Sequence, residues 1–103
     1  MAIVLQRRIG NSLARAYEQA RNEAAHRGAA TRHARRRARE RHDADLDAGS
    51  LAALEAGIRT GTWPAFARAS GGRTLHAVPG PRGPMPAVWC PALDRIVTFL
   101  HSH

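Results

Sequence analysis

Residues 61–78, GTWPAFARASGGRTLHAV, mark the point at which the pattern of this chain changes. Before Gly61 the apolar residues recur every three or four positions, whereas after Pro64 the period falls to two, which is typical of β-strands. Ser70-Gly71-Gly72 predicts a tight hairpin, because glycine adopts the positive φ angles of a primed turn without steric cost. The sequence therefore predicts helices first and strands second.

Four short strands are expected beyond this change of period. They cover residues 65–69, 73–78, 87–90 and 95–100. The proline-rich segment 79–84 cannot join a ladder and is expected to be an exposed connection, and residues 91–94 turn the chain into the last strand. Connections this short predict an antiparallel meander.

The clearest helix lies just before Gly61. Three apolar residues share one face of it: Leu51, Leu54 and Ile58. Asp47 or Ser50 is expected to cap its start, and Gly61 to end it after Thr60.

Two more helices are expected towards the N-terminus. The first ends near Gly28 and begins either at a cap on Asn11 or Ser12, or before Gly10, where Leu5 and Ile9 continue its stripe. That stripe consists of Leu13, Tyr17, Ala20 and Ala24.

The second of these helices runs from an N-cap at Thr31 to about His42. Its only apolar stripe is made of Ala30, Ala34 and Ala38. Small residues of this kind allow close contact with another element.

The 103 residues correspond to a single domain, 1–103. Of the 44% hydrophobic residues, 21 are alanine and only five are aromatic, so the core is expected to be thin. A four-stranded sheet needs one face covered, and only the helices can cover it. We therefore expect an α+β fold, in which a helix (1–28) and two further helices (31–61) pack on an antiparallel sheet (65–100).

The charge of the chain is strongly positive. Sixteen arginines and no lysine stand against eight carboxylates, which gives a formal charge of +8. Such a chain is expected to bind polyanions, and RNA is the partner that we predict. The absence of lysine can also reflect coding bias, so arginine by itself is no sign of bidentate recognition.

Several features of the sequence indicate the cellular compartment in which the protein is expected. The lone Cys90 forbids an internal disulfide, no apolar run approaches the ~20 residues of a membrane helix, and residues 2–5 are too short for a secretory signal core. We expect a cytoplasmic protein with no membrane partner. An organellar transit peptide is the alternative for the Arg-bearing first segment, although Glu18 and Glu23 interrupt the acid-poor pattern of such peptides.

Six histidines raise the question of a metal site. His26, His33 and His42 lack the four-residue spacing of a helical metal pair, and Cys90 has no nearby thiol partner. The glycines at 71 and 72 link two strands and do not open a helix, so they do not predict a phosphate-binding loop. We expect neither a metal nor another cofactor.

The helix predicted over residues 31–42 carries a combination of residues that suits a phosphodiester. A step of four places His33, Arg37 and Arg41 side by side, and Arg32, Arg36 and Glu40 form a further stripe that points to solvent. RNA cleavage without a metal needs a base, an acid and fixed positive charge for the developing phosphorane. A solvated arginine-rich face without chemistry explains the same spacing.

Two segments resemble a known group of proteins. Residues 31–42, TRHARRRARERH, resemble the K/R-H-A-x-x-R-x-x-x-R opening of small phage and bacterial RelE-like proteins. Residues 87–100, AVWCPALDRIVTFL, resemble the closing hairpin of that group, with its I-V-T-x-L strand. The resemblance covers residues 31–100 and leaves residues 1–28 outside. It implies the fold shared by barnase, EndoU, colicin-type tRNases and RelE toxins, which are usually metal-independent endoribonucleases.

Carried over to this chain, the resemblance implies a general acid/base role for His33, phosphate contacts for Arg37 and Arg41, and a place in the site for Thr98. RelE-like toxins often use lysine and tyrosine too, and here there is no lysine and only Tyr17, outside the match. The chemistry of the second strand adds two nucleic-acid-binding candidates, Arg73 and His76, which alternation places on opposite sides of the sheet.

Together these features predict an RNA-binding protein that acts as a metal-independent endoribonuclease of the RelE-like toxin type. The alternatives are a non-catalytic nucleic-acid-binding module, in which the arginine helix, Arg36 included, contacts phosphates, and a phage-associated interaction module. An acidic antitoxin or immunity protein is a further candidate partner, because the basic surface would speed its association.

Overall fold

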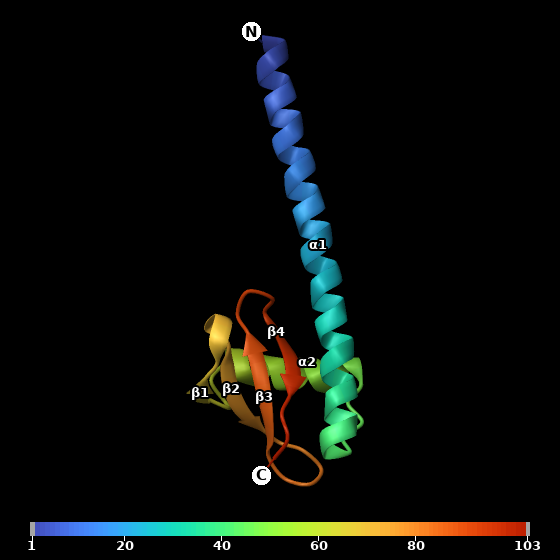
Figure 1. Cartoon of the computed structure of the whole chain (residues 1–103), viewed down its shortest axis with the longest axis vertical. Coiled ribbons are helices and arrows are strands. Elements are labelled where there is room, and N and C mark those ends of the chain that lie inside the picture. Colours follow the sequence, from blue (N-terminus) through green and yellow to red (C-terminus); the bar gives the residue numbers. More distant parts are fainter. Residues whose placement is uncertain (1, 103) are drawn as a thin grey trace.

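The computed structural model describes residues 2–102, and the side chains of residues 13–102. Two helices, α1 (Ala2–His42) and α2 (Ala48–Arg59), come before four strands. The strands are β1 (Ala65–Arg68), β2 (Thr74–Val78), β3 (Met85–Cys90) and β4 (Arg95–Phe99), with a short 3-10 turn at Ser70–Gly72. Figure 1 shows both helices beside the sheet, which confirms the predicted α+β class.

The four strands form one antiparallel sheet in the order β1-β2-β3-β4, so the predicted meander is confirmed. The hairpin between β1 and β2 also agrees with expectation: Gly71 and Gly72 have φ angles of 73° and 74°. The amide of Ala69 donates to the carbonyl of Arg73 over 2.9 Å and closes this turn. Strand β3 begins directly after the proline-rich connection.

The predicted break between residues 28 and 31 is wrong, because α1 is a single helix of 41 residues. A glycine inside a helix costs only about 1 kcal/mol relative to alanine, and Ala29 and Ala30 directly after Gly28 are strong helix formers. Thr31 is therefore an interior residue and not an N-cap. The backbone is already helical at Ala2, so the caps expected at Asn11 or Ser12 are wrong as well.

The C-terminal end of α1 lies close to the predicted position. Asp43 follows it with a positive φ of 54°, its amide donates to Arg39, and the amide of Ala44 donates to Ala38. These two bonds satisfy helix carbonyls that would otherwise lack a partner. The chain then reverses through residues 43–47 into α2.

Of the α1 residues whose side chains the structure describes, those in the C-terminal part pack against the rest of the molecule. The molecule measures 64 × 23 × 22 Å, and Figure 1 shows α1 projecting far beyond the sheet. Residues 13–26 are all exposed, including Leu13 at 66% and Tyr17 at 67%. The expectation that the first predicted helix covers the sheet is therefore wrong: its apolar stripe is too poor in large side chains and lies beyond the strands.

The core forms where the end of α1 and one face of α2 meet the sheet. Ala34 and Ala38 are fully buried there, as their spacing predicts, and allow a close approach of α1. α2 adds the predicted face, Leu51, Leu54 and Ile58. The sheet contributes Val78, Met85, Ala87, Trp89, Ile96 and Phe99.

The ends of α2 match the sequence prediction. Asp47 is the N-cap and accepts the amide of Ser50 over 2.7 Å, and Gly61 has a positive φ of 81° just after the C-cap Thr60. Within α2, Gly57 lies directly against the ring of Trp63. Among the helices that the structure describes, none is both long and apolar enough to cross a membrane.

Candidate nucleic-acid interface

The last three turns of α1 carry arginines on both sides of the buried alanines. Because successive helix positions are about 100° apart, Arg35 and Arg39 lie on one side of the Ala34–Ala38 row. His33 and Arg37 lie on the other side. Burial of the two alanines therefore fixes which way each arginine of this segment leaves the helix.

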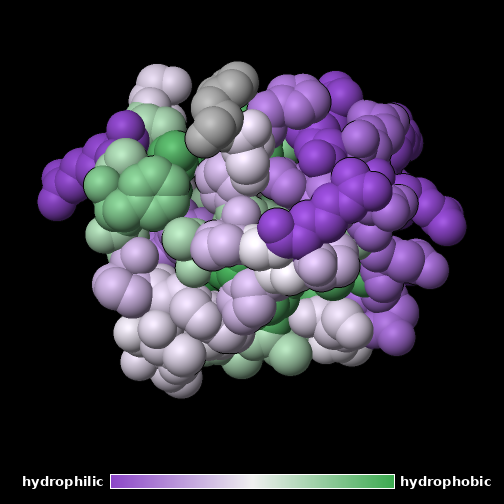
Figure 2. Space-filling view, turned by 90° about the horizontal axis from the view of Figure 1, so that it is seen from below, coloured by the Kyte–Doolittle hydropathy of each residue, from purple (hydrophilic) through white to green (hydrophobic). Residues whose placement is uncertain are grey.

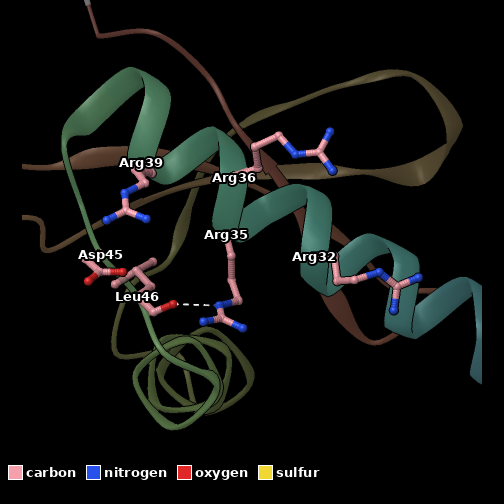
Figure 3. Close-up of a pocket in the computed structure, with 6 residues that line it drawn as sticks. All are labelled: Arg32, Arg35, Arg36, Arg39, Asp45 and Leu46. Carbon is pink, nitrogen blue, oxygen red and sulfur yellow. Dashed lines mark hydrogen bonds between the residues drawn. The ribbon is translucent and has the colours of Figure 1, made fainter.

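Arg35 and Arg39 face the linker between the helices and help to form a hollow of about 300 Å³. Figure 3 shows both side chains pointing from α1 towards the linker, whereas Arg32 and Arg36 extend along the helix. The hollow is lined by Arg32, Arg35, Arg36, Arg39, Asp45 and Leu46. We call this the arginine hollow.

The charge of the arginine hollow is strongly unbalanced. Four guanidiniums and one carboxylate line it, which leaves three net positive charges. Between residues 13 and 102, the ion pairs are those of Arg37 with Glu40, Arg59 with Asp94, and Arg82 with Asp43. None of them uses an arginine of the hollow, so its positive charge is free to meet an anion.

The linker that forms one wall of the arginine hollow is held in place from several sides. Arg35 Nε donates to the carbonyl oxygen of Leu46 over 2.7 Å, and Ala44 is buried. Hydrogen bonds from Ser50 lower the pKa of Asp47, and the nearby Arg35 lowers this pKa further. Asp47 is thus an anion at neutral pH, as its role at the positive N-terminus of α2 requires.

On the other side of the alanine row, Arg37 and Arg41, both predicted to contact the substrate phosphate, bond to groups of the protein itself. Arg37 pairs with Glu40 over 3.0 Å, and Arg41 donates to the carbonyl of Phe99 over 2.8 Å. The next residue, His42, is hydrogen-bonded to the carbonyl of Leu100. Arg41 and His42 thereby fasten the end of α1 to β4. His33 is half-buried and does not line the arginine hollow.

Thr98 lies on a different face of the molecule from the core. It pairs with Val88, whose neighbours Ala87 and Trp89 point into the core, so alternation directs Val88 and Thr98 to the opposite face of the sheet. Thr98 is half-buried there and lines no wall of the arginine hollow. The structure thus does not bring Thr98 into the hollow that the arginines form.

The two candidates from the second strand, Arg73 and His76, lie in different surroundings. Arg73 is exposed and lies just before β2, whereas His76 is 6% exposed and faces the core side of the sheet. The ring of His76 is hydrogen-bonded through Nδ1 to the carbonyl of Trp63 and through Nε2 to the hydroxyl of Thr74, each over 2.8 Å. Both ring nitrogens are used, so His76 holds β2 against the chain at Trp63.

Of the predicted site residues, only Arg36 lines the arginine hollow. Sequence reasoning missed Arg35, Arg39, Asp45 and Leu46 as site residues, and it placed Arg32 only on a stripe that points to solvent. A signal for the first two was present, because they follow the buried alanines by one position and so flank the packed face. The linker residues carried no such signal, since only the reversal of the chain after α1 brings them back to its arginines.

Within residues 13–102, no group of three or more His, Cys, Asp or Glu side chains is arranged to hold a metal ion. Comparisons with protein-family models, curated proteins and solved structures find no match for this chain. The resemblance to RelE-like proteins therefore stays a prediction.

Proposed function

We propose that this protein binds RNA, and that it does so by holding backbone phosphates in the arginine hollow. The observation that carries the proposal is the set of four arginines around one hollow with no ion pair between them and a carboxylate. A planar guanidinium donates several hydrogen bonds in a fixed fork, which suits the oxygens of a phosphate. Each such contact also releases counterions condensed on the nucleic acid.

The side chains that line the hollow favour contacts to the RNA backbone over recognition of the base sequence. Its polar groups are guanidiniums and a single carboxylate, and no aromatic or amide side chain lines it. Contacts to phosphates position a nucleic acid but carry no sequence information. We therefore expect affinity for many RNA sequences, with strong dependence on salt.

Removal of the free charges should weaken RNA binding. We expect the triple variant Arg32→Ala, Arg36→Ala, Arg39→Ala to lose on the order of tenfold or more in affinity for a single-stranded RNA oligonucleotide. Each lost phosphate contact on a single strand lowers the slope of log K against log salt by about 0.7, so the slope should fall by roughly 2. Fluorescence anisotropy over a salt series measures both quantities.

A matched control is available on the same helix. Arg15→Ala, Arg21→Ala, Arg27→Ala removes the same charge from the projecting part of α1, where these residues lie outside the arginine hollow. The control should retain most of the affinity. Equal losses in the two variants would show that only the net charge of the protein matters and would contradict a site at the hollow.

RNA cleavage stays a prediction of the sequence. We expect total RNA incubated with the protein in EDTA to be cut to ends with 2′,3′-cyclic phosphate, because a metal-independent mechanism uses the ribose hydroxyl as its nucleophile. His33→Ala should then abolish cleavage and leave RNA affinity nearly unchanged. Intact RNA with undiminished binding would leave a non-catalytic RNA-binding module.

A further inference from the structure

Phe66 is the extra residue of a β-bulge in the edge strand β1. Its neighbours Ala65 and Ala67 pair with His76 and Leu75, which are adjacent in β2, so one residue of β1 has no partner. Bulges of this kind re-aim a side chain and are frequent next to functional sites. Phe66 is 59% exposed, which makes it the most exposed large apolar residue outside α1.

The exposed ring forms one wall of a second hollow, of about 350 Å³. The hollow is lined by Phe66, Ala77, Pro84, Pro86, His101 and Ser102. Ala77 and Pro86 are cross-strand partners, and their neighbours His76, Val78, Met85 and Ala87 are buried. Alternation therefore places this hollow on the face of the sheet that the helices leave uncovered.

The lining of the hollow combines apolar side chains with two polar ones. Phe66 and two proline rings supply apolar surface. The imidazole of His101 can hydrogen-bond to the edge of a planar ring, and the hydroxyl of Ser102, which donates to the carbonyl of Pro84 over 3.5 Å, can accept from it. No carboxylate lines the hollow. An aromatic side chain exposed on a sheet is a common platform for the unpaired bases of RNA.

The charge of the molecule favours a nucleic-acid occupant over an apolar peptide. The chain has a net charge of +8, and Arg82, in the connection that ends at Pro84, pairs with Asp43 at the end of α1. This pair bridges the segment that lines the second hollow and the linker that lines the arginine hollow. Figure 2, a view from below, shows hydrophilic residues gathered on the side where α1 ends and a hydrophobic patch on the side of β1. A strand held through its phosphates near α1 can thus place a base on the apolar side.

We propose that Phe66 is a stacking platform for one unpaired base of the bound RNA, which makes single-stranded RNA the ligand class of this protein. The inference rests on the proposed function, since the arginine hollow supplies the phosphate contacts. The base lies against the Phe66 ring, and His101 and Ser102 face its edge.

The test compares two ligands of equal charge: a single-stranded RNA dodecamer, and a dodecamer of the same backbone in which every position is abasic. Stacking on an aromatic side chain contributes enough that Phe66→Ala should weaken binding of the first ligand by about tenfold. Binding of the abasic ligand should not change. Phe66→Tyr should behave like the parent, and Phe66→Leu should lose most of the tenfold, because leucine is apolar but has no flat π-face.

Tyr17→Ala is the matched control, because Tyr17 is the other strongly exposed aromatic residue and lies on the projecting part of α1. It should not change the ratio of the two affinities. If Phe66→Ala binds the dodecamer as tightly as the parent does, Phe66 is not a stacking platform. If Phe66→Leu binds as tightly as the parent while Phe66→Ala does not, the hollow needs only an apolar side chain and stacking is again contradicted. If neither ligand binds the parent, the proposed RNA binding itself fails.

Discussion

Replacement of Gly57 by alanine should lower the melting temperature by roughly 10 to 20 °C, the equivalent of about 2 to 3 kcal/mol in a domain of this size. A methyl group at this position would overlap Cζ3 and Cε3 of Trp63 and lie 2.7 Å from its Cη2. The backbone amides of Thr62 and Trp63 both donate to the carbonyl of Gly57, over 2.9 and 3.5 Å, so the backbone that carries the indole is held against this part of α2 and the added methyl group must displace the ring. Thermal unfolding followed by far-UV circular dichroism measures the change.

Gly49→Ala in the same helix is the control for this prediction. A methyl group there would have Asp47 Oδ1 as its nearest neighbour at 3.5 Å, which is an ordinary contact. Alanine is the better helix former, so this variant should be as stable as the parent or slightly more stable. A Gly57→Ala protein that melts with the parent would mean that Trp63 does not pack on α2.

Phe99→Ala should cost about 3 to 5 kcal/mol in the free energy of unfolding, because it leaves a cavity at the contact between α1 and the sheet. The Phe99 side chain is fully buried, and His42 meets its ring edge to face with the ring centroids 6.4 Å apart. Urea unfolding should show a lower midpoint with an unchanged slope. The arginine hollow depends on this contact, since it positions the last turns of α1.

Leu100→Ala is the control that distinguishes the contribution of the Phe99 side chain from that of the backbone hydrogen bonds in this region. Leu100 is 36% exposed, and its carbonyl accepts from His42 just as the carbonyl of Phe99 accepts from Arg41. Both backbone bonds survive in both variants, so Leu100→Ala should cost at most about 1 kcal/mol. Equal losses at positions 99 and 100 would contradict a core centred on Phe99.

The sheet and α2 could be predicted from the sequence because their signals are local. The Gly71-Gly72 turn, the prolines of segment 79–84 and the cap at Asp47 each determine the conformation of only a few residues. The break at Gly28 failed for a different reason. Glycine weakens a helix without ending it, and α1 continues past Gly28 because alanines follow this residue and Ala34 and Ala38 pack in the core.

The candidate site was only partly predictable. The spacing of Ala34 and Ala38 identified the packed face of the helix, but Arg35 and Arg39, which flank that face and line the arginine hollow, were not predicted as site residues. Which side of the helix would meet the linker depends on the direction of the reversal at Asp43, where φ is 54°. Likewise, the strand pattern identified β1 but not the bulge that exposes Phe66, since a bulge arises from the register between two strands.

Although α1 is one continuous helix, its two parts differ in local stability. From Ala34 onwards its turns melt only when the core around Phe99 opens, whereas residues 13–26 depend on their own backbone bonds, which are marginal in isolated helices of this length. A ligand that ordered the projecting segment would extend the cooperative unit along the helix axis towards the N-terminus. α1 thus joins a segment anchored in the core to a projecting segment whose stability a ligand can raise without any rearrangement of the sheet.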